Sequence, residues 1–202
     1  MGDVTALDRV LDQAGGFFMG DSPIHRAASA IAGHLEALGI DYAVAGALCL
    51  AAHGVVRTTE DVDILVTQQG LERFKQTWLG RGYVNLRPGG KAVRDAENGV
   101  KIDFLVAGDF PGDGKPKPVV FPDPKAVSVP SGSFRILPLA RLIELKLASG
   151  MTAPHRLQDL ADVLRLVQSA ELARDFAGQL HPYVRDKYDE IWLAAQHDTD
   201  DY

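Results

Sequence analysis

Apolar and polar positions along the chain follow two different periods, which predict strands and helices in alternation and then helices alone. Short apolar or alternating runs, typical of strands, occupy residues 40–46, 61–66 and 83–87 and two stretches within 91–110. Apolar residues at helical spacing fill the intervals at 22–39, 47–53 and 68–82. Beyond these, four helical patterns follow one another at 139–149, 155–168, 171–180 and 184–196. The pattern predicts an α/β half, at about residues 22–136, followed by a helical half, with a boundary near Pro138.

Turn and capping residues mark several of these elements. Ser22 and Pro23 fit the cap and first position of a helix that continues to Gly39. Asn98 and Gly99 separate the two strand-like runs within 91–110, so we expect a β-hairpin there. Much of the proline and glycine of the chain lies in residues 107–125, which we expect to form an exposed loop.

Two carboxylates, Asp61 and Asp63, interrupt an otherwise apolar strand. Residues two apart in a strand point to the same face, so these like charges become neighbours. Such a pair needs a shared proton or a cation, and oxygen ligands favour a hard ion such as Mg²⁺. If the strand that contains Asp103 pairs beside this one, a third carboxylate reaches the same point and two metal ions become possible.

Composition narrows the class of protein. The formal net charge of −6 gives the chain no overall attraction for nucleic acid, although a local basic patch could still bind it. Cys49 is the single cysteine and lies in an apolar setting, so we expect it to pack, in a chain suited to a reducing compartment. We find no export signal and no apolar run near the roughly 20 residues that span a bilayer, so we expect a cytoplasmic protein without a membrane partner.

The stretch "VAGALCLAAHGVVRTTEDVDILV" resembles the signature of the DNA polymerase beta nucleotidyltransferase superfamily, in which a strand, a small-residue turn and a short helix precede a strand with Asp-x-Asp. Within it, residues 54–65 are similar to the AbiEii-like branch of minimal nucleotidyltransferases, which includes toxins of toxin-antitoxin pairs. The later segment "LIELKLASGMTAPHRLQDLADVLRLV" resembles the same branch. The likeness covers about residues 24–168.

This resemblance implies an α+β nucleotidyltransferase fold, with a small mixed β-sheet and flanking helices followed by a C-terminal helical bundle. The catalytic region would span residues 1–137 and the helical region residues 138–202. The implied reaction transfers a nucleoside monophosphate from an NTP to a hydroxyl acceptor, with Mg²⁺ or Mn²⁺ as cofactor. The acceptor is open among RNA (tRNA in particular), protein and a small molecule such as an antibiotic, and a cognate antitoxin is an expected partner.

The resemblance also assigns roles to individual residues. Three aspartates would hold the metal ions and catalyse the transfer, with the third also helping to deprotonate the attacking hydroxyl: Asp61, Asp63 and Asp103. Five residues would contact the nucleotide, through backbone amides at the first two and side chains at the others: Gly46, Ala47, Arg57, Thr59 and Lys146.

Two positions depart from the family pattern, and several residues have a plainer interpretation. Position 47 is Ala where the family has Gly or Ser, and Gln158 stands where related sequences often have Lys. Arg57 and Thr59 could simply shape the loop before the strand, and Lys146 could be solvated. Three residues spaced by three could form ion pairs along one helix: Arg156, Asp159 and Asp162.

Two functions therefore remain open from the sequence. The first is an Mg²⁺-dependent nucleotidyltransferase. The second is a catalytically weak or inactive module with the same fold that binds a nucleotide or a partner, and Ala47 is its best support.

Overall fold

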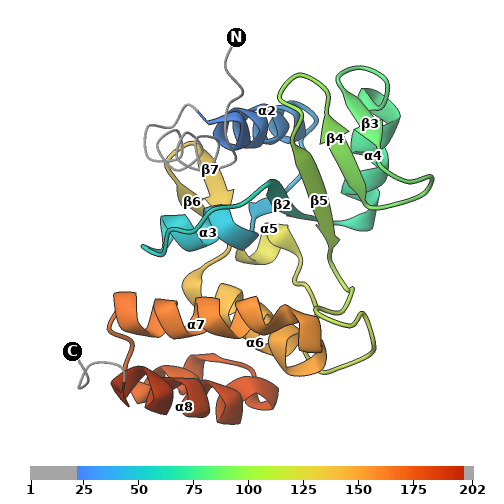
Figure 1. Ribbon diagram of the computed structural model, residues 1–202. Coiled ribbons are helices and arrows are strands. Elements are labelled where there is room, and N and C mark those ends of the chain that lie inside the picture. The colour runs from blue at the N-terminus through green and yellow to red at the C-terminus, as the bar shows by residue number, and fades with distance from the viewer. Residues whose placement is uncertain (1–21, 198–202) are drawn as a thin grey trace.

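A mixed β-sheet covered by helices occupies the first part of the chain in the computed structural model, which describes residues 22–197 (Figure 1). Within those residues seven strands form one sheet in the order β3-β4-β5-β2-β1-β7-β6. The strands are β1 Ala43–Val44, β2 Asp61–Val66, β3 Tyr83–Asn85, β4 Ala92–Asp95, β5 Lys101–Val106, β6 Val129–Ser131 and β7 Phe134–Ile136. The α-helices are α2 Pro23–Ala37, α3 Gly46–Ala52, α4 Gln68–Trp78, α5 Pro124–Val127, α6 Leu139–Thr152, α7 Leu157–Ser169 and α8 Pro182–His197. Two 3₁₀-helices, η1 Pro154–Arg156 and η2 Arg174–Gln179, complete the described elements. The expected fold class, a mixed sheet with flanking helices followed by helices, is confirmed.

The centre of the sheet is the parallel pair of β2 and β5. Asp61 lies opposite Lys101, and Asp63 lies opposite Asp103. Strand β4 joins β5 in an antiparallel hairpin, and the turn passes through Gly99 with φ of 70°. The hairpin expected at Asn98 and Gly99 is therefore confirmed, and it places the strand that contains Asp103 beside β2.

Helices α2 and α4 supply the apolar cover of the sheet. The Ser22 side chain accepts a hydrogen bond of 3.1 Å from the amide of His25, which confirms the predicted cap of α2. On β5, Phe104 alternates with Asp103 and so points to the other face. There its ring lies 5.3 Å from that of Phe74 in α4, centroid to centroid. Because the apolar core covers this face, the aspartates of β2 and β5 lie on the opposite face, outside that core.

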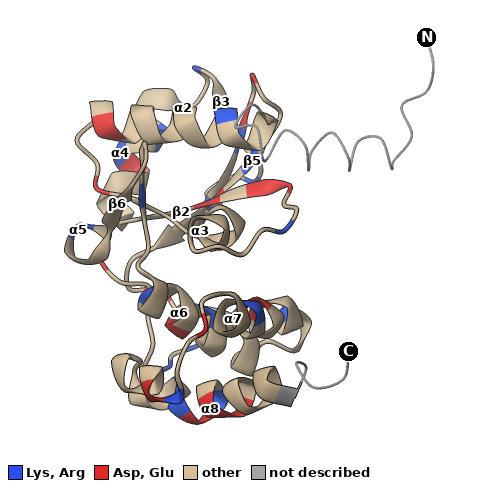
Figure 2. Cartoon of the chain, turned by 90° about the vertical axis from the view of Figure 1, so that its left-hand side faces the viewer, with Lys and Arg blue, Asp and Glu red and all other residues tan. Residues whose placement is uncertain are grey.

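The C-terminal helices pack on one another and on the sheet region. Helices α6 and α7 lie between the sheet and α8 in both views (Figures 1 and 2). In α8, the Tyr188 hydroxyl donates to the carbonyl of Ala173 at 3.1 Å, and the Trp192 indole donates to that of Leu172 at 2.8 Å. Apolar side chains from the sheet and from α6 to α8 belong to one hydrophobic cluster. The boundary at residues 137 and 138 stays a prediction, because continuous packing does not show whether either part folds alone.

Helix α3 is tied to the segment that enters α6. The Cys49 thiol donates to the carbonyl of Leu137 at 3.4 Å, and the His53 Nε2 lies 2.8 Å from the same oxygen. Burial raises the pKa of the Cys49 thiol to about 12, so it is a packing residue, as expected. His53 is the C-terminal cap of α3.

Some predicted elements differ from the structure. The strand expected at 40–46 is reduced to Ala43–Val44. The helix expected at 171–180 is wrong in type and start, because Glu171 has a φ of 47°, which does not fit a right-handed helix, and only the 3₁₀-helix at Arg174–Gln179 follows. The hairpin of β6 and β7 was not predicted. Pro130 is the middle residue of its first strand, which lies at the edge of the sheet, where proline is tolerated.

In the described part of the chain, no helix combines the length and apolar character that crossing a bilayer requires. The N-terminal stretch in which we expect no export signal lies largely outside the described residues.

Candidate functional site

Three carboxylates, those of Asp61, Asp63 and Asp103, occupy one face of the β2 and β5 pair. Asp61 and Asp63 are two residues apart in β2, and Asp103 is the register partner of Asp63 in β5. Register partners in neighbouring strands point to the same side of a sheet, so all three share a face. Burial, followed by the charges of Asp61 and Asp103, raises the pKa of Asp63 to about 6, against the opposing effect of Lys146 and Arg156. The three like charges therefore interact.

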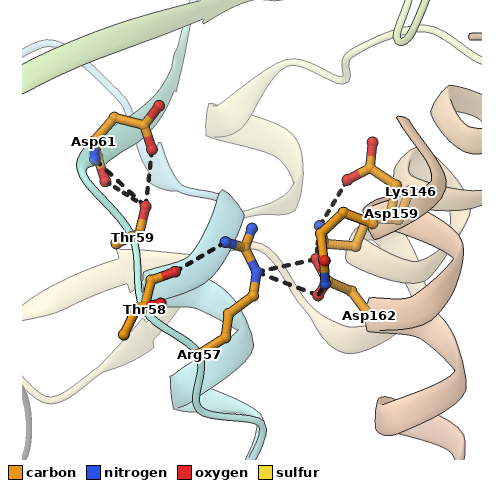
Figure 3. Close-up of polar contacts among 8 residues, drawn as sticks. Arg57, Thr58, Thr59, Asp61, Lys146, Asp159 and Asp162 are labelled. Carbon is orange, nitrogen blue, oxygen red and sulfur yellow. Dashed lines mark hydrogen bonds and ion pairs between the residues drawn. The ribbon is translucent and has the colours of Figure 1, made fainter. Parts of the chain in front are cut away.

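Thr59 holds the first of these carboxylates in place. Its hydroxyl lies 2.8 Å from Oδ1 of Asp61 and 3.2 Å from the Asp61 carbonyl oxygen (Figure 3). The backbone amide of Asp61 in turn donates to the Thr59 hydroxyl at 3.4 Å. The structure thus places Thr59, which we expect to contact the nucleotide, against Asp61, where it orients that carboxylate.

Lys101 is a residue of this face that the sequence analysis missed. Its Nζ lies 3.8 Å from Oδ2 of Asp61 and forms a closer ion pair with Oδ2 of Asp103. The hydrogen bond with Asp103 raises the pKa of Lys101. The signal in the sequence was its spacing of two residues from Asp103, which places both side chains on one face of a strand.

This arrangement bears on the prediction of a bound metal ion. The donors are carboxylate oxygens only, which is the chemistry that Mg²⁺ prefers. Yet among residues 22–197 no three acidic, histidine or cysteine side chains are assembled closely enough to hold a metal ion. The donor type and strand register fit a metal ion, but the side chains as they stand do not gather around one point, and the Lys101 ammonium forms ion pairs with two of the expected ligands. Binding of a metal ion would therefore require these side chains to move.

Gly46 allows the turn between β1 and α3 to lie close against Asp63. Its φ is 57°, a left-handed value, and a Cβ at this position would lie 1.9 Å from Oδ2 of Asp63. The amide of Ala45 also donates to the carbonyl of Asp63 at 2.9 Å. Ala47, the next residue of α3, has a buried side chain. The small-residue turn therefore lies directly against the second carboxylate.

A pocket opens between this turn and helices α6 and α7. Its lining includes Gly46 and Asp63 on one side and Arg57, Lys146 and Arg156 on the other. The structure thus gathers three basic residues and two acidic ones, Asp63 and Asp159, around one opening. Ala47 and Thr59, also expected at the nucleotide, are not among the lining residues.

Two of those basic residues belong to a buried ion-pair network (Figure 3). The Lys146 ammonium lies 2.7 Å from the fully buried Asp162 carboxylate and 3.0 Å from that of Asp159. Asp162 also pairs with Arg57 at 3.2 Å and accepts from the Gln158 amide at 2.9 Å. The network joins the loop before β2 to α6 and α7 across the pocket.

The expectation that Arg156 pairs with Asp159 and Asp162 along one helix is therefore wrong. Asp159 and Asp162 pair with Lys146 of α6 rather than with Arg156. In the part of the chain that the structure describes, Arg156 forms no ion pair, and it lines the pocket that faces Asp63. Sequence spacing alone could not reveal this, because the true partner lies on another helix.

Comparison with known proteins yields similarity of structure but not of sequence. No protein-family model and no curated protein matches the sequence. Seven solved chains match the structure. The antibiotic-resistance factor ANT(2'')-Ia, in a solution structure, is 12% identical with a TM-score of 0.47, over 84% of this chain and 93% of that one. JHP933 from Helicobacter pylori is 15% identical with a TM-score of 0.46, over 87% of this chain and 90% of that one. Similarity this distant supports no functional conclusion, and the AbiEii-like resemblance stays a prediction.

Replacement of Gly46 by Ala tests the contact between the turn and Asp63. Gly39→Ala is the matched control, because Gly39 has a φ of 61° and no atom within 4 Å of an added Cβ. Both variants carry the left-handed strain of about 1–2 kcal/mol, and Gly46→Ala should lose at least about 1 kcal/mol more because its Cβ displaces Asp63. Urea unfolding measures the difference, and equal losses would contradict the close approach.

Replacement of Asp162 by Ala tests the buried network. The free energy of unfolding should fall by about 3 kcal/mol or more, because Lys146 keeps only Asp159 and Arg57 loses its buried partner. Asp189→Ala breaks the exposed pair with Arg174 and should cost less than about 1 kcal/mol. Chemical denaturation gives both values, and a loss at Asp162 as small as the one at Asp189 would show that Lys146 and Arg57 do not depend on Asp162 as a buried partner.

Proposed function

We propose that the chain is an Mg²⁺-dependent nucleotidyltransferase of the AbiEii-like kind, which transfers a nucleoside monophosphate from an NTP to a hydroxyl group. The observation that carries the proposal is the register of β2 and β5, which sets Asp63 beside Asp103, with Asp61 on the same face. A glycine turn and a pocket with three basic side chains adjoin Asp63. Carboxylates, a close backbone turn and cations together suit phosphoryl chemistry, in which positioning and charge stabilisation do most of the work.

The triphosphate would lie in the pocket between the glycine turn and α6. Arg156 is the best-placed side chain for it, since Arg57 and Lys146 are already paired with Asp162. An arginine can bind phosphate oxygens through two parallel hydrogen bonds. Lys146 would add positive charge from a fixed position, and the amides of Gly46 and Ala47 remain the expected backbone contacts.

Asp61, Asp63 and Asp103 would hold the divalent metal, which supplies positive charge to the triphosphate when bound. In the transfer, the acceptor oxygen forms a bond to the α-phosphorus as the bond from that phosphorus to pyrophosphate breaks. Asp103 would take the proton of the attacking hydroxyl at its carboxylate oxygen. Thr59 would keep the Asp61 carboxylate in one orientation throughout.

The acceptor would approach through a groove on the other side of Asp103. Among its lining residues are three cations, Arg87, Lys91 and Lys101, and the apolar side chain of Leu86. Positive charge at this point favours an acceptor that carries phosphate, such as RNA, over a polycationic antibiotic. The net charge of −6 limits this attraction to the groove itself.

A second candidate function is a nucleotide-binding or interaction module without turnover. The Lys101 ammonium between Asp61 and Asp103 favours it, because it occupies the position expected for a metal ion. Such a module would bind its partner, for instance an antitoxin, through the helical region. Both charge signs are interspersed along α8 (Figure 2), which is suited to a polar contact of this kind.

Incubation with each labelled NTP, Mg²⁺ and cellular RNA distinguishes the two functions. The wild-type chain should transfer label to RNA, and Asp103→Asn should lower the rate by at least about 100-fold, because the proton acceptor and one of three metal-holding carboxylates are lost. NTP binding should persist, because the cations of the pocket are unchanged. Asp186→Asn, an exposed change on α8, is the matched control and should transfer at the wild-type rate.

NTP binding without transfer to RNA, protein extract or small hydroxyl compounds would favour the module. Transfer to an aminoglycoside in place of RNA would leave the reaction intact and contradict the anionic acceptor. Equal rates in Asp103→Asn and wild type would remove Asp103 from the mechanism.

A further inference from the structure

The three carboxylates of the candidate site already have a cation of their own. Lys101 Nζ pairs with Oδ2 of Asp103 and lies 3.8 Å from Oδ2 of Asp61, with 40% of the lysine side chain exposed. Those are the oxygens that a divalent ion would need. The ammonium and a metal ion would therefore compete for the same space and for the same two carboxylate oxygens.

The backbone fixes Lys101 in this position. Lys101 is the register partner of Asp61 across the parallel strands and lies two residues before Asp103 on its own strand. Both relations put its side chain on the face that bears the carboxylates. Lys101 therefore reaches Asp61 and Asp103 from a strand of the sheet, and no loop has to close over the site to bring it there.

Other cations near the carboxylates are differently placed. Lys146 is tied to Asp159 and Asp162, and Arg156 lies across the pocket that faces Asp63. In the metal-free chain Lys101 thus provides the direct ion pair to Asp61 and Asp103. Without it, the mutual repulsion of the three carboxylates would increase.

We infer that Lys101 is an internal counter-ion of the acidic site, which stabilises the metal-free chain and which a divalent cation must displace in order to bind Asp61 and Asp103. The displacement rests on the proposed function, whereas the stabilisation does not. The ammonium has room to move, because Lys101 also lines the groove beside Asp103 with Arg87 and Lys91. Lys101 is a positioning residue in this scheme and takes no proton from the substrate.

Manganese binding by the isolated full-length chain tests the displacement, with the free ion followed by electron paramagnetic resonance. Lys101→Met keeps the length of the apolar stem and removes the charge. It should bind Mn²⁺ at least about fivefold more tightly than wild type, because the competing cation is gone. Lys187→Met, which breaks the pair with Glu190 on α8, is the matched control and should bind as wild type does.

Equal or weaker Mn²⁺ binding in Lys101→Met than in a wild type that does bind would overturn the displacement and leave the proposed function standing. Absence of Mn²⁺ binding in every variant would overturn the displacement together with the metal dependence of the proposed function.

A thermal double-mutant cycle in EDTA tests the stabilisation separately. Lys101→Met should lower the unfolding midpoint by about 1–3 °C in the wild-type background, as expected for a partly exposed ion pair in a chain of this size. In the Asp103→Asn background the same change should have at most half that effect, since the main partner is already neutral. Equal effects in the two backgrounds would overturn the role of Lys101 as counter-ion.

Discussion

The mutual repulsion of Asp61, Asp63 and Asp103 is the constraint that the cations of the candidate site must offset. The parallel register of β2 and β5 leaves the three carboxylates no other face, because the alternate positions are filled by the apolar core. A chain selected for stability alone would not place three like charges together. The arrangement is tolerated because Lys101 pairs with two of them and because Lys146 and Arg156 face the third.

The same electrostatics connects the sheet to the helices. The ion pairs of Asp162 with Arg57 and Lys146 span the space between the loop before β2 and helices α6 and α7. Buried pairs of this kind contribute little net stability when they are intact, but they restrict how the two parts can be placed. Here they keep the cations of α6 and α7 on the far side of a pocket whose near side is Gly46 and Asp63. The helical region is thus part of the candidate site.

Local patterns in the sequence predicted the centre of the sheet well. Strand β2, the hairpin before Asp103 and the cap at Ser22 all follow from side-chain period, turn residues and capping, which depend on near neighbours. The placement of Asp103 beside Asp63 needed only the additional assumption that their strands pair. Contacts between distant segments were not accessible in this way. The pairing of Asp162 with Lys146 and Arg57, and the pocket position of Arg156, depend on how α7 packs on α6. The contact of Lys101 with Asp61 likewise depends on which residues face each other across β2 and β5, which the spacing within one strand does not give.

If one face of β2 and β5 is an acidic site for a divalent cation, paramagnetic broadening of backbone amide signals will locate the ion there. When the ¹⁵N-labelled full-length chain is titrated with substoichiometric Mn²⁺, we expect the amide signals around Asp61, Asp63 and Asp103 to broaden first, while those of α8 persist. Broadening that begins at the acidic residues of α8, or that spreads evenly over the chain, would contradict a divalent-cation site on this face.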